Sequence, residues 1–86
     1  MQLEVVNPAT GKPFATVSRA DAAQLEEAIA AAKSAAPAWA ALGCAARGEY
    51  LTKLADAIEA NKDEFAKLLT TEQGKPLKQA TGEVIG

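Results

Sequence analysis

The sequence contains no histidine and only one cysteine, Cys44. Structural zinc centres are built from clustered cysteine and histidine ligands, so these absences argue strongly against such a site. A single cysteine cannot form an intramolecular disulfide, and a lone thiol fits a reducing compartment. We therefore expect a cytoplasmic chain that is stabilised by packing alone.

The chain also lacks a strong charge of either sign. Nine basic and eleven acidic residues give a net charge of -2, and no basic stripe is present. Nucleic acids and anionic membranes are therefore poor candidate partners. No stretch approaches the roughly 18 apolar residues of a membrane span. The first residues show no basic region followed by an apolar run, so they do not form a signal peptide.

Turn-forming residues separate two short apolar runs near the N-terminus. Residues 3–6 and 14–18 flank the segment Asn-Pro-Ala-Thr-Gly-Lys-Pro. Pro8 fixes φ for a turn and Gly11 can adopt positive φ, so the pattern predicts a hairpin ribbon over residues 3–18. Two short strands alone are marginally stable, so the ribbon must pack on another element.

The remainder of the chain predicts a mainly helical segment. Helices are expected over residues 22–41, 45–60 and 62–73, with the start of a fourth over 76–86. Asp21 and Gln24 form a capping box at the first start, and Pro37 ends or kinks that helix near its end. The fourth helix has no stop signal before Gly86, so we expect the chain to be a piece of a longer protein.

The predicted helices carry apolar stripes at helical spacing. These stripes are Leu25, Ile29, Ala32 and Ala36; Leu51, Leu54, Ala55 and Ile58; Phe65, Leu68 and Leu69; and Leu77, Ala80 and Val84. Asn61 suits the end of the second helix in a left-handed conformation, and with Glu64 it also suits a capping box for the third. Gly74 is the predicted C′ residue of the third helix.

Several motifs occur together in a recognisable order and spacing. They are Asn7-Pro8-Ala9-Thr10-Gly11, Asp21, Ala38-Trp39, Arg47, Leu51 with Leu54-Ala55-Asp56, Ile58-Glu59 and Leu68-Leu69-Thr70-Thr71-Glu72-Gln73-Gly74-Lys75-Pro76-Leu77, followed by Ala80 and Glu83. Each motif alone is a common turn or helix end. Together they resemble the N-terminal segment of the NAD(P)-dependent aldehyde dehydrogenase family, over essentially the whole chain.

The resemblance implies a large α/β enzyme that oxidises an aldehyde to a carboxylic acid through a cysteine thiohemiacetal, with NAD or NADP as the hydride acceptor. The nucleophile, general base and nucleotide-binding strands of the family lie downstream of the matched segment. Residues 1–86 would then belong to the nucleotide-binding domain. We therefore expect no catalytic, cofactor-binding or metal-ligating residue here, and neither the aldehyde nor the choice between NAD and NADP can be predicted.

A few residues invite a functional interpretation. Cys44 does not match the family's active-site stretch and is interpreted as a small residue at a helix boundary. Lys75 lacks the glycine-rich loop of a phosphate site. Glu72 and Glu83 lie on different predicted helices, which favours helix-end hydrogen bonds or salt bridges to Lys75 or Arg47 over acid–base chemistry. Trp39 and Leu42 are interpreted as large apolar side chains that fill the core, as a core plug.

Two hypotheses of different class follow. In the first, the chain is an N-terminal part of an aldehyde dehydrogenase and is inactive alone. In the second, it is a stand-alone helical interaction or oligomerisation module built on that scaffold. Under either hypothesis the apolar stripes need a partner, which is the remainder of the enzyme or a second copy of the chain.

Overall fold

The structure is a computed structural model that describes all 86 residues. Its elements are, in chain order, β1 (Gln2–Asn7), β2 (Lys12–Ser18), α1 (Ala22–Ala41), α2 (Gly43–Ala60), α3 (Lys62–Gln73) and α4 (Leu77–Ile85). This confirms the predicted fold class, a mainly helical segment with an N-terminal β-ribbon. None of the helices combines the length and the apolar character that crossing a membrane requires.

The ribbon is an antiparallel hairpin with one irregularity. Val5 pairs with Ala15 but Val6 pairs with Pro13, so Phe14 is the extra residue of a β-bulge. In the turn, the carbonyl oxygen of Asn7 accepts a hydrogen bond from the Gly11 amide at 2.8 Å. The Asn7 side chain accepts a second from the Ala9 amide at 2.9 Å, as asparagine does in a turn.

Helix α1 begins and ends largely as its residues predict. Asp21 Oδ1 accepts from the Gln24 amide at 2.8 Å, and Gln24 Oε1 accepts from the Asp21 amide at 3.0 Å, which confirms the capping box. Pro37 lies inside the helix, which continues to Ala41. Helix α2 then begins at Gly43, whose φ of 78° only glycine adopts readily, rather than at residue 45.

Asn61 behaves differently from its prediction. Its φ of -112° is not left-handed, and its side chain makes no capping hydrogen bond to α3. Instead Asn61 Nδ2 donates to the Ala57 carbonyl at 2.8 Å, which turns the side chain back onto α2. The predicted capping box with Glu64 is therefore wrong, because the amide already has a partner one turn earlier. Gly74 has φ 75° and closes α3, as predicted.

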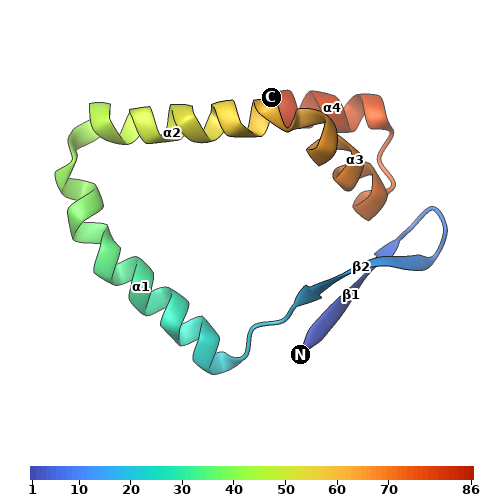
Figure 1. Ribbon diagram of the computed structural model, residues 1–86, viewed down its shortest axis with the longest axis horizontal. Coiled ribbons are helices and arrows are strands. Elements are labelled where there is room, and N and C mark those ends of the chain that lie inside the picture. The colour runs from blue at the N-terminus through green and yellow to red at the C-terminus, as the bar shows by residue number, and fades with distance from the viewer.

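The elements form an open, flat ring rather than a packed core. Helices α1 and α2 make two sides of an arc, and the hairpin with α3 and α4 completes it (Figure 1). The radius of gyration is 17.2 Å, against about 12 Å for a compact domain of this length. The thinnest dimension is 14 Å, close to the roughly 10–12 Å diameter of one helix with its side chains.

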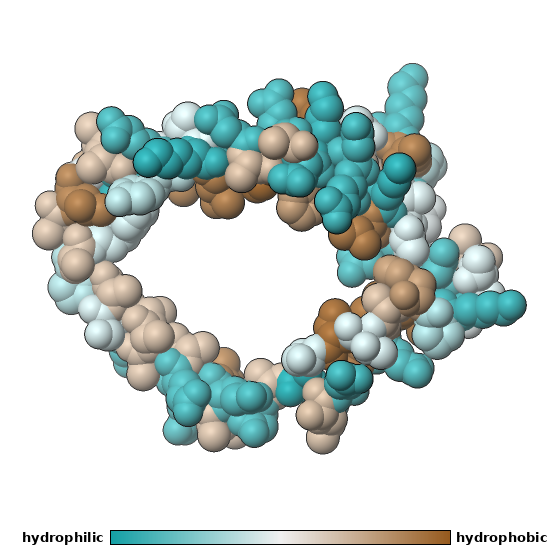
Figure 2. Space-filling view, viewed as in Figure 1, coloured by the Kyte–Doolittle hydropathy of each residue, from teal (hydrophilic) through white to brown (hydrophobic).

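Burial is confined to one end of this ring. Ala66 on α3 and Ala80 on α4 are the two buried residues. The stripes of α1 and α2 are exposed, with Leu54 at 57%, and apolar surface lines the edge of α2 that faces the opening (Figure 2). The predicted core plug is also wrong, because Trp39 is 42% exposed and Leu42 is exposed beside it. The physical reason is that α1 and α2 diverge from their corner and nothing covers their inner faces.

Candidate functional site

Two sequence motifs from opposite ends of the chain meet in the structure. Gly74 lies in the turn between α3 and α4, and its amide donates to the Thr70 carbonyl at 2.8 Å. A Cβ atom at residue 74 would lie 3.2 Å from Pro8 Cγ in the hairpin turn. Glycine is therefore required twice, for positive φ and for the close approach of the proline ring. This contact joins the hairpin to the α3–α4 pair.

Lys75 follows that turn and forms an ion pair with Glu83 on α4. The pair is partly exposed, with side-chain exposures of 25% and 55%, so its net stabilisation is small. This is one of the structural roles predicted for Glu83. Because Lys75 already has an anionic partner, the structure gives no support for a phosphate site at this residue.

Glu72 makes no hydrogen bond with Glu83, whose partner is Lys75. It lines an open groove of about 390 Å³ between α2, α3 and α4. The other lining residues are all apolar: Ile58, Phe65, Leu68, Leu69 and Val84. A groove with five apolar side chains and one carboxylate is unsuited to a nucleotide phosphate and has the character of a packing surface.

The corner between α1 and α2 is held by Arg47. Its Nη1 donates to the Ala40 carbonyl at 2.8 Å, and its Nη2 donates to Cys44 Sγ at 3.4 Å. Cys44 is exposed in the first turn of α2, and the chain contains no histidine that could act as its base. The cysteine therefore contributes to a helix junction, in agreement with its interpretation as a boundary residue.

Aromatic side chains meet across the same corner. The rings of Trp39 and Tyr50 have centroids 5.6 Å apart at an angle of 52°. Lys53 Nζ lies 5.4 Å from the Tyr50 ring centroid, within cation–π range. These contacts link α1 to α2 while leaving Trp39 and Tyr50 half exposed.

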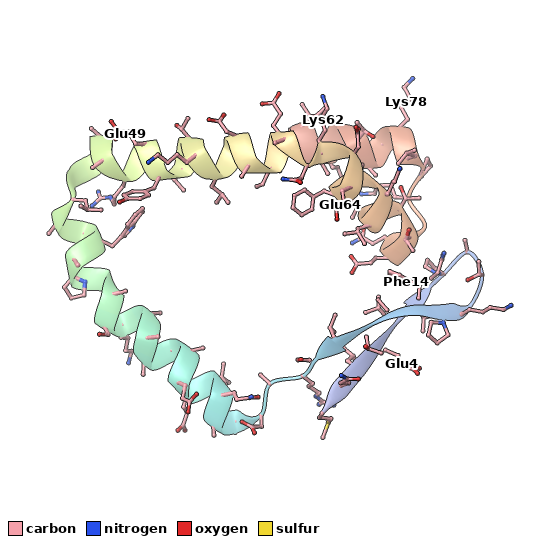
Figure 3. The ribbon with its side chains drawn as sticks, in the orientation of Figure 1. Glu4, Phe14, Glu49, Lys62, Glu64 and Lys78 are labelled. Carbon is pink, nitrogen blue, oxygen red and sulfur yellow. The ribbon has the colours of Figure 1, made fainter.

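Charged side chains from three helices lie on the outer side of the ring. Glu49 on α2, Lys62 on α3 and Lys78 on α4 point away from the opening (Figure 3). No group of three or more cysteine, aspartate or glutamate side chains converges as metal ligands would. Apolar surface thus lines the edge of α2 that faces the opening, and these three charged side chains lie on the outer side.

Comparison with known proteins shows the family of this chain. The sequence matches the aldehyde dehydrogenase family over residues 1–86. The chain belongs to the aldehyde dehydrogenase family. It is 44% identical over 82 residues to glutarate-semialdehyde dehydrogenase of Pseudomonas putida, covering 95% of this chain and 17% of that protein. It is 41% identical over 80 residues to malonate-semialdehyde dehydrogenase 1 of Oceanobacillus iheyensis, covering 93% of this chain and 16% of that protein.

A solved structure contains a segment of the same shape. The crystal structure of PnpE in complex with nicotinamide adenine dinucleotide matches 99% of this chain with a TM-score of 0.91 and 42% identity. The match takes in 18% of the PnpE chain. This aldehyde dehydrogenase segment thus spans about one sixth of the length of the relatives that it matches, and the resemblance predicted from its motifs is confirmed.

Sequence reasoning missed two features of the segment. The contact between Pro8 and Gly74 joins residues that are distant in the chain, although both motifs show the glycine and proline of tight turns. The hydrogen bond from Arg47 to the Ala40 carbonyl was also unforeseen. A signal for it existed, since an arginine just after a helix break can reach the free carbonyls of the preceding helix.

Proposed function

We propose that this chain is the N-terminal part of the nucleotide-binding domain of an NAD(P)-dependent aldehyde dehydrogenase, which oxidises an aldehyde to a carboxylic acid. The observation that carries the proposal is the family match along the full 86 residues. The likeness to PnpE, which was crystallised with NAD, favours NAD as the cofactor of the complete protein. The lone free thiol favours a cytoplasmic location.

The relatives also favour a substrate class. Three of them are named as dehydrogenases of glutarate, malonate and succinate semialdehydes. All three compounds are short aldehydes that carry a carboxylate at the other end. We propose such a semialdehyde as the substrate of the complete enzyme, without a preferred chain length.

Within that enzyme, the part played by residues 1–86 is structural. Its single cysteine, Cys44, lacks a neighbouring base, and its groove is apolar rather than suited to phosphate. The chain alone should therefore form no NADH from any of the three semialdehydes. NADH formation above background by the purified chain would contradict this assignment of the chemistry to other residues.

A chimera tests the proposal directly. Residues 1–86 replace the matching segment of the Pseudomonas putida glutarate-semialdehyde dehydrogenase. We expect NADH formation with glutarate semialdehyde to stay within about tenfold of the parent enzyme, a loss of about 1.4 kcal/mol in transition-state stabilisation. The control is the same enzyme with the segment deleted, which should be inactive. A chimera as inactive as the deletion would refute the structural equivalence.

A second candidate function is favoured by the exposed apolar stripes. Leu25, Leu51 and Leu54 are each more than half exposed, which is typical of an interface. In this alternative the chain is a stand-alone module that associates with itself through these stripes. Sedimentation equilibrium separates the alternatives, since a module of this kind sediments as a concentration-dependent dimer or larger oligomer.

A further inference from the structure

The change of direction between α1 and α2 is made at a single residue. Leu42 follows α1 with φ -64° and ψ -22°, which are right-handed helical values. Gly43 begins α2 with φ 78°, and it alone has positive φ among residues 22–60. Pro37 does not cause the corner, because α1 continues through it to Ala41. The corner in Figure 1 therefore depends on the left-handed conformation of Gly43.

Few interactions hold the bent junction. Arg47 donates to the Ala40 carbonyl, and the aromatic ring of Trp39 lies beside that of Tyr50. No residue of α1 or α2 is buried. The start of α2 has no side-chain cap and no acidic residue in its first turn, so its amides lack the groups that usually stabilise a helix N-terminus.

The same residues have a second helical conformation available. With negative φ at Gly43, α1 and α2 would form one helix over residues 22–60, and the first amides of α2 would bond to the last carbonyls of α1. Such a helix would be about 58 Å long, whereas the longest extent of the structure is 48 Å. Alanine, the strongest helix former, occurs on both sides of the junction, at Ala40, Ala41, Ala45 and Ala46.

We propose that Gly43 is the hinge of a two-state junction, at which the chain exchanges between the bent form and a continuous helix over residues 22–60. Glycine adopts positive and negative φ about equally readily, so rotation at one residue connects the two forms. The bent form has the shape of the matching PnpE segment. The continuous helix lies outside that shape and gives up the contacts of Arg47 with Ala40 and of Trp39 with Tyr50.

Alanines of opposite handedness at residue 43 test the hinge. L-Alanine disfavours positive φ and favours a helix over glycine, so Gly43→Ala should lower the ratio of bent to continuous form at least about tenfold. D-Alanine has the mirror-image preference and should hold the bent form. An L-Cβ atom at residue 43 meets nothing within 4 Å, so the effect of Gly43→Ala comes from φ and not from a clash. Chemical ligation of residues 1–43 to residues 44–86 gives all three chains, because Cys44 supplies the required N-terminal thiol.

The single tryptophan and the single tyrosine report the state of the junction. Their ring centroids lie 5.6 Å apart in the bent form, whereas in a continuous helix these residues would be about 16 Å apart along the axis. A nuclear Overhauser contact between the two rings should be strong in the D-alanine chain and almost absent in the Gly43→Ala chain. Small-angle scattering of the Gly43→Ala chain should give a radius of gyration above 17.2 Å, with no loss of helix content by circular dichroism.

Exchange in the unsubstituted chain has its own measurement. Relaxation dispersion of the amides around Gly43 should show exchange that the D-alanine chain lacks. Gly48→Ala is the matched control, since it favours the helix within α2 without altering the junction, and it should leave the ring contact unchanged.

Three results would overturn the hinge. One is a Gly43→Ala chain that keeps the ring contact between Trp39 and Tyr50. Another is loss of helix content in that chain, because the junction would then come apart rather than straighten. The third is equal relaxation dispersion in the unsubstituted and D-alanine chains, which would leave the bent form as the single state of the junction.

Discussion

The two ends of this molecule are held together by different means. At the α3–α4 end, two buried alanines bring the helices into contact, and Pro8 packs against the turn at Gly74. At the α1–α2 end no residue is buried, and the corner is held by the hydrogen bonds of Arg47 and by an exposed aromatic pair. We call α3, α4 and the hairpin turn the packed unit, and we call α1 and α2 the arm.

Composition does not explain this difference. Helix α1 contains more alanines than α3 or α4, and small residues permit close approach, yet α1 buries none of its residues. Alanine is buried where a neighbouring element is present within this chain, as Ala66 and Ala80 are. The comparison shows that α1 has the small residues of a helix that packs closely against a neighbour, although none of its residues is buried in this chain.

The largest expected effect is at the turn that joins the packed unit to the hairpin. Gly74→Val forces a β-branched residue into positive φ and places its Cβ against Pro8. We expect a loss of about 3 kcal/mol in the stability of this end, seen as faster amide hydrogen exchange in α3 and α4. Gly48→Ala is the control, because the space around Gly48 is open and alanine favours the helix. Unchanged amide protection of α3 and α4 in the Gly74→Val variant would contradict the conclusion that the contact with Pro8 stabilises this end.

Overpacking the α3–α4 contact comes next. Ala80 is fully buried, so Ala80→Leu should destabilise this end by about 2 kcal/mol. Ala31→Leu changes an exposed alanine of α1 and should have almost no effect. Urea denaturation of both variants, followed by circular dichroism, provides the measurement. Equal shifts of the two midpoints would mean that the arm is packed as well.

A smaller effect is expected at the start of the arm. Asp21→Ala removes both hydrogen bonds of the capping box and should cost about 1 kcal/mol. Because the contacts of α1 with α2 lie at its C-terminal end, at Trp39 and Ala40, the loss should appear as reduced helicity and faster exchange in its first turns. Asn61→Ala removes a hydrogen bond to the end of α2 but no cap of α3, and it should leave α3 intact. A fully helical α1 in the Asp21 variant would indicate support from elsewhere.

The smallest effect is expected for the ion pair between Lys75 and Glu83. Both groups are partly exposed, so Glu83→Gln should cost no more than about 0.5 kcal/mol. The difference from the unsubstituted chain should shrink as salt is added, since salt screens exposed pairs. Thermal unfolding at low and high ionic strength measures it. A large, salt-independent loss would assign Glu83 a different structural role.

Local signals in the sequence predicted the elements, and partner-dependent features escaped prediction. The reciprocal bonds of Asp21 and Gln24 and the positive φ of Gly74 depend on neighbouring residues only, and the structure contains both. Asn61 was ambiguous because its amide can serve either helix, and the bond to the Ala57 carbonyl decided the outcome. The bulge at Phe14 depends on strand register, which a two-stranded ribbon specifies weakly.

The exposed apolar face of α2 could also be predicted only in part, because its exposure depends on which other elements cover it. Helical spacing identified the stripe of Leu51, Leu54 and Ile58 as one face, but spacing cannot say whether anything covers that face. Trp39 was assigned to a core because large aromatic residues are usually well buried, and the structure leaves it half exposed beside Tyr50. The pairing of Lys75 with Glu83 was within the predicted set because both lie near one turn.

The contact between Pro8 and Gly74 also orders the events of folding. The α3–α4 pair joins neighbouring segments, so it can form early from local contacts. The hairpin turn reaches Gly74 only after most of the chain has been drawn into a loop, and closing such a loop has an entropic cost. The ring therefore closes last. A growing polypeptide would form the helical pair from local contacts, and the hairpin, which is marginal alone, would gain its support when Pro8 reaches Gly74.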